Sequence, residues 1–384
     1  MPVKAIGVEG ILPDLRSALP DGWRGGTFVG RMATDAGPSP ILIVDGDLYD
    51  MSGVAPTVVH LVERGDFSGA GGTRIGAFDA DAVQLLSPID LQCVKACGVT
   101  FAVSALERVI EERARGDWRQ AGEIRTRIEE RIGGSITDVV PGSPQAAELK
   151  ATLIEDGMWS QYLEVAIGPD AEVFTKAPVL ASVGPDAEIG VRSDSSWSNP
   201  EPEIALLVNS AGVAVGAMLG NDVNLRDFEG RSALLLGKAK DNNASCSLGP
   251  LVRMFDAGFT LDDVRQADVR LTIHGEDGYV LEGESNMRKI SRDPADLVRQ
   301  ALSEHQYPDG LVLFLGTLFA PVQDRDEPGR GFTHKVGDMV SIESEKLGRL
   351  VNRVVTSAAA PPWSFGIVAL MRNLTDRNLL SVKK

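Results

Sequence analysis

Cysteine is scarce in this 384-residue chain, which contains only Cys93, Cys97 and Cys246. A disulfide-stapled secreted domain needs several cysteine pairs, and a zinc site built on Cys93 and Cys97 needs a second pair of ligands. The sequence offers neither. We interpret the three cysteines as reduced thiols and expect a cytoplasmic protein.

Long apolar runs and excess positive charge are also lacking. No stretch reaches the roughly 18 consecutive apolar residues of a membrane-spanning helix, and the N-terminus has no apolar secretion signal. Lys and Arg number 38 against 54 Asp and Glu, a net charge of −16. Because nucleic acids and anionic membrane surfaces bind clustered cations, we expect neither as a partner.

The chain has an ordinary globular composition, with 43% hydrophobic and 24% charged residues. Short apolar runs broken by Gly and Pro predict strands, with a hairpin turn at Asp45-Gly46. Apolar residues at helical spacing predict helices over 103–133 and 293–305. Strands without regular helical alternation predict a β-dominated α+β fold. We divide the chain into a smaller β-rich N-terminal domain (1–90), a helical connector and lid (91–150) and a catalytic domain (151–384).

Two glutamates, Glu201 and Glu203, stand one residue apart where an apolar run begins. Alternate residues of a strand share a face, so the two carboxylates would point the same way while Ile204 and Leu206 face the other side. Like charges that are close and partly buried repel unless a cation lies between them. The pair is therefore either a solvated strand start or part of a divalent-cation site.

The residues downstream favour the cation site. Asn221-Asp222 ends the next apolar run, so Asp222 can supply a third oxygen from a neighbouring strand. Lys238 and Lys240 follow shortly after. Three carboxylates with open positions for water or substrate suit Mg²⁺.

Taken together, these motifs resemble the fumarylacetoacetate hydrolase superfamily, whose pattern is an E-x-E pair, a later N-D and a lysine before an L-G-P-like turn. Here these are Glu201-Pro202-Glu203, Asn221-Asp222 and Lys240 ahead of Leu248-Gly249-Pro250; FTKAP (174–178), ESNM (284–287) and the L-G-T of 315–317 continue the match. The resemblance covers roughly 150–375. It implies a mixed, barrel-like β catalytic domain, Mg²⁺ or Mn²⁺ held by Glu201, Glu203 and Asp222, and a homodimer or dimer of dimers.

Many hydrolases of this family carry a His and a Glu on a lid segment, in a pattern like N-Y-x-x-H-x-x-E. The corresponding stretch has Ser104 at the histidine position and Glu107 at the acid position, with Glu111 and Glu112 one turn further. Serine is no base near neutral pH, so the hydrolytic dyad is broken. We expect Glu107, or failing that Glu111 or Glu112, to take part in acid–base transfer; the alternative is a solvated helix surface.

The broken dyad and the run 192–208 resemble the branch that dehydrates 2-keto-3-deoxy pentonates to 2,5-dioxopentanoate, which is α-ketoglutarate semialdehyde. The resemblance implies a hydro-lyase of pentose catabolism acting on the acid derived from D-xylonate or D-arabinonate. Lys240 is either the base or a group that orients the substrate carboxylate. The expected substrate contacts are Ser104, Arg192, Ser193, Ser195 and Thr317.

Two other functions stay open on the sequence alone. One is C–C hydrolysis of an acylpyruvate or fumarylacetoacetate on the same metal, which a histidine supplied from elsewhere in space would favour. The other is a non-catalytic sugar-acid-binding protein, which would need neither the lysine nor the lid glutamates.

Overall fold

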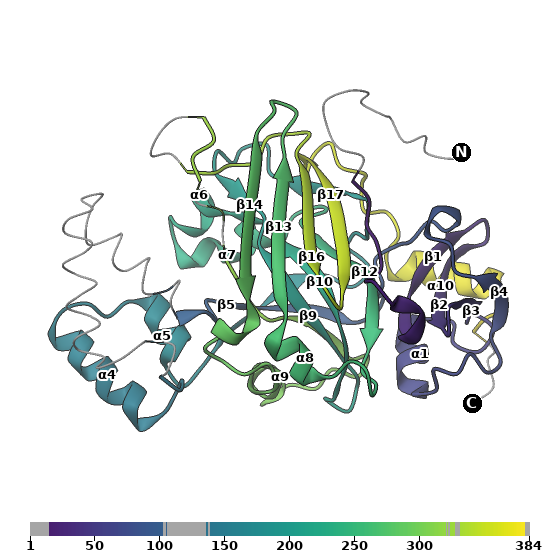
Figure 1. Cartoon of the computed structure of the whole chain (residues 1–384), viewed down its shortest axis with the longest axis horizontal. Coiled ribbons are helices and arrows are strands. Elements are labelled where there is room, and N and C mark those ends of the chain that lie inside the picture. Colours follow the sequence, from purple (N-terminus) through teal and green to yellow (C-terminus); the bar gives the residue numbers. More distant parts are fainter. Residues whose placement is uncertain are drawn as a thin grey trace.

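Figure 1 shows the computed structural model, which describes residues 15–102, 105, 136, 139–319, 321, 323–326 and 331–380. These residues form a ten-stranded, a five-stranded and a two-stranded sheet. The ten-stranded sheet has the order β4-β3-β2-β1-β12-β10-β9-β15-β5-β6. Its strands are β1 (Phe28–Thr34), β2 (Gly37–Val44), β3 (Asp47–Asp50), β4 (Thr73–Ala77), β5 (Cys93–Gly98), β6 (Glu172–Ala177), β9 (Pro202–Val208), β10 (Ala214–Asp222), β12 (Cys246–Met254) and β15 (Leu311–Phe314).

The five-stranded sheet packs on the central part of the larger one. Its order is β14-β13-β16-β17-β7, and its strands are β7 (Glu188–Val191), β13 (Asp268–His274), β14 (Val280–Asn286), β16 (Met339–Ser344) and β17 (Gly348–Thr356). The apolar cluster between the sheets combines Leu206 of β9 with Leu271 of β13 and Ile342 of β16. Within the described residues neither sheet closes on itself. The predicted β-dominated α+β fold is confirmed, as packed open sheets rather than a closed barrel.

The N-terminal strands extend the central sheet. The predicted hairpin at Asp45-Gly46 is confirmed: β2 and β3 pair in antiparallel register, and the two turn residues have φ of 52° and 81°. Both values lie in the left-handed region that Asp and Gly tolerate in hairpin turns. β1 pairs with β12, Phe28 opposite Arg253. One face of these strands joins an apolar cluster that also contains α1 (Val58–Arg64).

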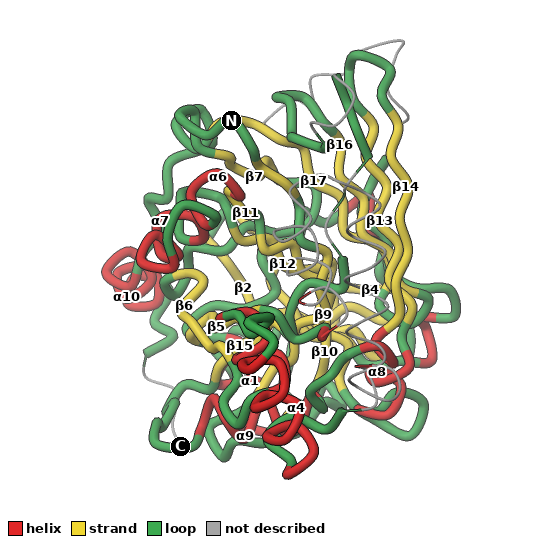
Figure 2. Tube along the Cα trace, turned by 90° about the vertical axis from the view of Figure 1, so that its left-hand side faces the viewer, coloured by secondary structure: helices red, strands yellow, loops and turns green. Residues whose placement is uncertain are grey.

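Helices lie around the sheets (Figures 1 and 2). The predicted helix at 293–305 is confirmed as α9 (Pro294–Leu302), which the side chain of Asp293 caps. The predicted helices at 103–133 fall almost wholly outside the described residues. The other elements are α4 (Pro144–Glu155), α5 (Gln161–Ile167), α6 (Arg226–Glu229), α7 (Leu236–Lys240), α8 (Leu261–Gln266), α10 (Ile367–Asp376) and the 3₁₀ turns η1 (Trp23–Gly25), η2 (Ala80–Ala82), η4 (Ala233–Leu235) and η5 (Met287–Lys289). Among the described helices, none combines the length and apolar character needed to cross a bilayer.

Candidate metal centre

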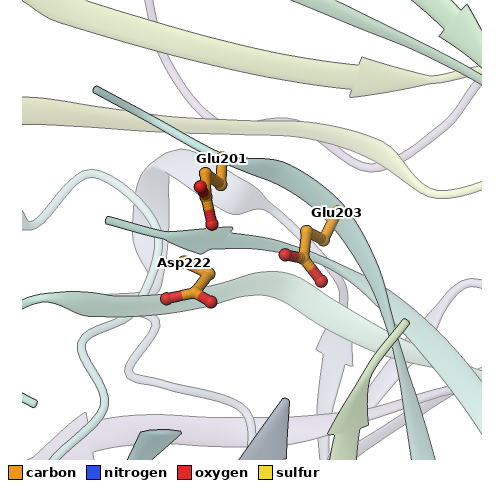
Figure 3. A group of neighbouring side chains, drawn as sticks. All are labelled: Glu201, Glu203 and Asp222. Carbon is orange, nitrogen blue, oxygen red and sulfur yellow. The ribbon is translucent and has the colours of Figure 1, made fainter. Parts of the chain in front are cut away.

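Three carboxylates meet where β9 and β10 lie side by side. The antiparallel register puts Glu203 opposite Gly220, and the N–H of Asp222 donates to the carbonyl of Glu201 at 3.1 Å. One oxygen of each of the three carboxylates lies within 4.8 Å of the other two. Figure 3 shows the three side chains close to one another. Glu201 is 6% exposed and Glu203 and Asp222 are 1% exposed, so the interpretation as a solvated strand start is wrong.

Glu203 is bound by uncharged donors from the turn after β15. The N–H of Gly316 donates to its Oε2 at 2.7 Å, and the hydroxyl of Thr317 donates to its Oε1 at 3.1 Å. Gly316 has a φ of 101°, and a Cβ there would lie 2.0 Å from the hydroxyl oxygen of Thr100. Only glycine therefore allows this turn to bring its N–H to the carboxylate. Among the described residues Glu203 has no cationic partner.

Two buried lysines partner the other carboxylates. The ammonium of Lys240, at the end of α7, donates to Glu201 and, at 3.1 Å, to Oδ2 of Asp222. The ammonium of Lys176, on β6, lies 2.6 Å from Oδ1 of Asp222 and also donates to the carbonyl of Val223. Lys176 is fully buried and Lys240 is 3% exposed. Asp222 is thus held between two ammonium groups.

These surroundings shift the four titrating groups in different directions. Burial raises the pKa of Glu203 well above its usual value, and the charges of Asp222 and Glu201 raise it further. Burial also raises the pKa of Glu201. Burial would raise the pKa of Asp222 as well, but Lys176 and Lys240 outweigh it and lower that pKa. Burial works to lower the pKa of Lys240, but Asp222 and Glu201 outweigh it and raise that pKa.

The donor set fits a divalent cation. When all three buried carboxylates are ionised they face only two ammonium groups, which leaves one negative charge uncompensated away from water. Such a charge is costly unless it is paired or coordinates a metal. All three ligands offer hard oxygen atoms, the kind that Mg²⁺ and Mn²⁺ prefer. Glu201, Glu203 and Asp222 are therefore the residues that would hold the ion.

The short sheet of β8 (Ser198–Asn199) and β11 (Asn224–Leu225) supports Glu201. The amide of Asn224 donates to Oε1 of Glu201 at 3.0 Å and to Oε2 of Glu229 at 2.6 Å. Sequence reasoning assigned no role to Asn224, Glu229 or Lys176. The FTKAP motif contains Lys176, but nothing in its spacing indicates a contact with Asp222.

The predicted substrate-contact residues divide into two groups. Thr317 lies against Glu203, as described above. Arg192 instead pairs with Asp194 at 2.8 and 2.7 Å, and the hydroxyl of Ser195 donates to Asp227 at 2.7 Å. Ser193 is exposed in the same loop. Among the described residues, this loop forms no hydrogen bond with the three carboxylates.

The lid residues lie outside the part of the chain that the structure describes. These are Ser104, Glu107, Glu111 and Glu112. Their roles stay predictions.

Comparison with known proteins finds a matching family and relatives that are named dehydratases. Residues 155–355 match the model of the fumarylacetoacetate hydrolase C-terminal family. Over 202 residues the chain is 32% identical to a probable 2-keto-3-deoxyxylonate dehydratase of Haloferax volcanii, covering 53% of this chain and 66% of that protein. Over 186 residues it is 31% identical to a 2-dehydro-3-deoxy-D-arabinonate dehydratase of Saccharolobus solfataricus, covering 48% and 58%. The matches thus span less than two thirds of these relatives.

Solved structures share the fold. A 2-keto-3-deoxyarabinonate dehydratase superposes with a TM-score of 0.62 and 22% identity, covering 85% of this chain and 98% of that one. A 2-keto-3-deoxy-D-arabinonate dehydratase complexed with magnesium and 2,5-dioxopentanoate gives 0.60 and 22%, covering 86% and 99%.

Proposed function

The chain belongs to the fumarylacetoacetate hydrolase family, and from that premise we propose that it is a metal-dependent dehydratase. Its substrate is a five-carbon 2-keto-3-deoxy sugar acid derived from D-xylonate or D-arabinonate, and its product is 2,5-dioxopentanoate. Such an enzyme acts in pentose catabolism in the cytoplasm, as a homo-oligomer. The observation that carries the proposal is the buried carboxylate cluster with one negative charge more than its lysines balance.

Glu201, Glu203 and Asp222 would hold Mg²⁺ or Mn²⁺. When bound, the ion supplies Lewis-acid stabilisation of the negative charge that develops as a proton leaves the carbon beside a keto group. The similarity to two dehydratases of 2-keto-3-deoxy pentonates supports this reaction class. In such a dehydration C3 loses a proton and C4 loses its hydroxyl as water, and tautomerisation then gives the 5-aldehyde.

The chain's own residues would position the substrate and move its protons. Lys240 contacts two of the three carboxylates, so we assign it the role of a charged donor that orients the ligands and the substrate carboxylate. Thr317 offers a hydroxyl at the same edge of the cluster. We propose that Glu107, Glu111 or Glu112 transfers the protons of the elimination, with Ser104, Arg192, Ser193 and Ser195 as further substrate contacts.

The histidines argue against the alternative of C–C hydrolysis. The chain has four, His60, His274, His305 and His334, and none belongs to the carboxylate cluster. His60 bonds to Thr57, and His334 bonds to Asp338. Without an imidazole at the site, water lacks the base that hydrolysis needs, a loss worth about 10² to 10⁴ in rate.

Purified protein loaded with Mg²⁺ and given a panel of 2-keto-3-deoxy acids and acylpyruvates tests the proposal, with products identified by mass. We expect loss of water from a five-carbon 2-keto-3-deoxy acid to exceed acylpyruvate cleavage in kcat/KM by about 10² or more. Chelator should abolish turnover. A higher kcat/KM for the acylpyruvate would mean that the protein is a hydrolase and not a dehydratase. Full turnover in excess chelator would mean that the reaction needs no metal.

A further inference from the structure

A group of cations surrounds one aromatic ring beside the metal centre. The guanidinium of Arg231 lies 4.5 Å, the ammonium of Lys238 5.1 Å and the guanidinium of Arg192 5.5 Å from the centroid of the Phe228 ring. Arg231 and Lys238 are exposed. This concentration of positive charge stands out in a chain whose net charge is −16.

Two of these cations form no salt bridge among the described residues, although acidic side chains lie near them: Lys238 is close enough to Asp194 to act on it electrostatically. Arg192 forms a bidentate pair with Asp194, and the nearby Asp227 accepts hydrogen bonds from Ser195 and Ser196. Arg231 and Lys238 form no ion pair with any carboxylate that the structure describes. We call these two residues the cationic rim.

The cationic rim lies on the elements that contact the metal centre. Lys238 is in α7, the helix whose last residue, Lys240, reaches Glu201 and Asp222. Arg231 follows α6, whose Glu229 shares Asn224 with Glu201. Figure 1 shows α6 and α7 next to each other, with the five-stranded sheet between them and α10 in this view. The rim is therefore an exposed group of cations that short segments join to residues around the carboxylate cluster.

We propose that Arg231 and Lys238 attract the anionic substrate to the site against the repulsion of the remaining acidic surface. This inference rests on the proposed function for the identity of the anion, the carboxylate of a 2-oxo acid. Local positive charge raises the concentration of an anion at a site and its association rate by roughly 10 to 10³, and salt screens the effect. The stacking on Phe228 holds the rim in place whether or not an anion is present.

The direction in which kcat/KM changes with salt distinguishes an effect of the cationic rim from an effect of the net charge of the whole molecule. A field set by the net charge of −16 would repel the substrate, so kcat/KM would rise as salt is added. A local rim predicts that kcat/KM falls as salt goes from about 20 to 500 mM, over which the Debye length shrinks from ~20 to ~4 Å. We expect the fall.

The double variant Arg231→Gln, Lys238→Gln should lower kcat/KM about tenfold at low salt, through KM rather than kcat, and should reverse the salt dependence. The matched control is Arg24→Gln with Arg372→Gln. Arg24 also stacks on an aromatic ring, 4.7 Å from that of Trp23, and Arg372 is exposed on α10. The control changes the net charge equally and should behave as wild type.

Titration of the Mg²⁺-loaded protein with oxalate, a dianion that resembles a 2-oxo acid, gives a readout independent of turnover. Its affinity should fall in the rim variant, at low salt only, and not in the control. Equal oxalate affinity in the two double variants, or a wild-type kcat/KM that rises with salt, would contradict the proposed role of the cationic rim. Absence of dehydratase activity with a rim-dependent oxalate affinity overturns the proposed function alone.

Discussion

Glu203 is the carboxylate of the centre for which the described residues provide no cation. Its replacement by Gln keeps the shape and retains an oxygen for the Gly316 N–H, but removes a charged ligand. Wild type should gain about 2.7 kcal/mol of unfolding free energy when Mg²⁺ is at 100 times its Kd. Glu203→Gln should gain almost none, while it stays folded in chelator. Thermal melts with and without Mg²⁺ measure both.

Glu343→Gln is the control for this change. Glu343 lies on β16 of the five-stranded sheet, away from the cluster, and pairs with Arg349 of the neighbouring strand β17. It should retain the stabilisation by Mg²⁺. If Glu203→Gln is stabilised as much as wild type, Glu203 is not a ligand.

Lys176 is one of the two cations that bind Asp222, so its removal leaves Asp222 with Lys240 as its only ammonium partner among the described residues. In metal-free protein, Lys176→Met would leave three buried carboxylates facing a single ammonium group. Breaking a buried pair in this way typically costs about 3 to 5 kcal/mol. The pair of Lys150 and Glu164, whose side chains are 35% and 41% exposed, supplies the control, since Lys150→Met should cost less than about 1 kcal/mol. Urea unfolding compares the two, and equal losses would mean that Lys176 does not stabilise Asp222.

At the residue scale the sequence predicted what depends on local spacing. Glu201 and Glu203 lie together because they are two residues apart in extended chain at the start of β9, and Asp222 joins them because β10 turns back beside β9. Lys176 was not predicted as a partner, because β6 pairs only with β5 in the sheet. Its contact with Asp222 comes from packing that no local pattern encodes.

At the scale of elements, the segment 332–334 holds β8, which leads into Glu201. It does so through three hydrogen bonds: Trp197 Nε1 to the Phe332 carbonyl at 3.0 Å, the Ser198 N–H to the Thr333 hydroxyl at 3.1 Å, and the His334 N–H to the Ser198 carbonyl at 3.0 Å. β8 also pairs with β11, which presents Asn224 to Glu201. The position of this candidate metal ligand thus depends on a loop far away in sequence.

Arg325 anchors that loop. Its side chain is 1% exposed, and its guanidinium donates to both oxygens of Asp338 at 2.7 Å and to the Thr333 carbonyl at 3.2 Å. Arg325→Lys cannot form the bidentate pair. Because supporting residues of a metal site typically change its affinity by about 10 to 100-fold, we expect about a tenfold weaker Mn²⁺ affinity in titrations.

Arg292→Lys is a matched control for the loss of a buried guanidinium. Arg292 is 2% exposed and donates to the carbonyls of Val165, Gly168 and Asp170, in the last turn of α5 and just after it. Its loss should affect stability but not Mn²⁺ affinity. If the two Lys variants bind Mn²⁺ with equal affinity, Arg325 stabilises the fold but does not position the metal site.

Elements with strong local signals were predicted, and their partners in the sheets were not. The Asp45-Gly46 turn and the Asp293-capped helix follow from turn and cap chemistry. The parallel pairing of β5 with β15, Cys93 opposite Leu311, joins strands far apart in the chain. Such pairings are decided by the burial of both faces of a strand, which apolar runs alone leave undetermined.

At the scale of the whole molecule, the ten-stranded sheet includes strands from both the predicted N-terminal and catalytic domains. β1 lies between β2 and β12, and Val29 and Leu42 share an apolar cluster with Met218 and Val252. α10 adds a second connection, since the amide of Asn373 donates to the carbonyl of Ala36 at 2.7 Å. Figure 1 shows α10 beside the first strands. The N-terminal strands thus cover an edge and an apolar face of the central sheet.

A chain comprising residues 91–384 alone should therefore fail to fold as a soluble unit. Its β12 would have a free edge, and the apolar side chains that face Val29 and Leu42 would meet water, a combination that promotes aggregation. Co-expression of residues 1–90 as a separate fragment should restore solubility and Mg²⁺-dependent stabilisation, because it returns the missing edge partner and the apolar face. Size-exclusion chromatography and thermal melts of the two preparations decide. A monodisperse 91–384 fragment that melts cooperatively and is stabilised by Mg²⁺ would show that the metal centre folds without the first strands, and that the shared sheet is an attachment rather than a requirement.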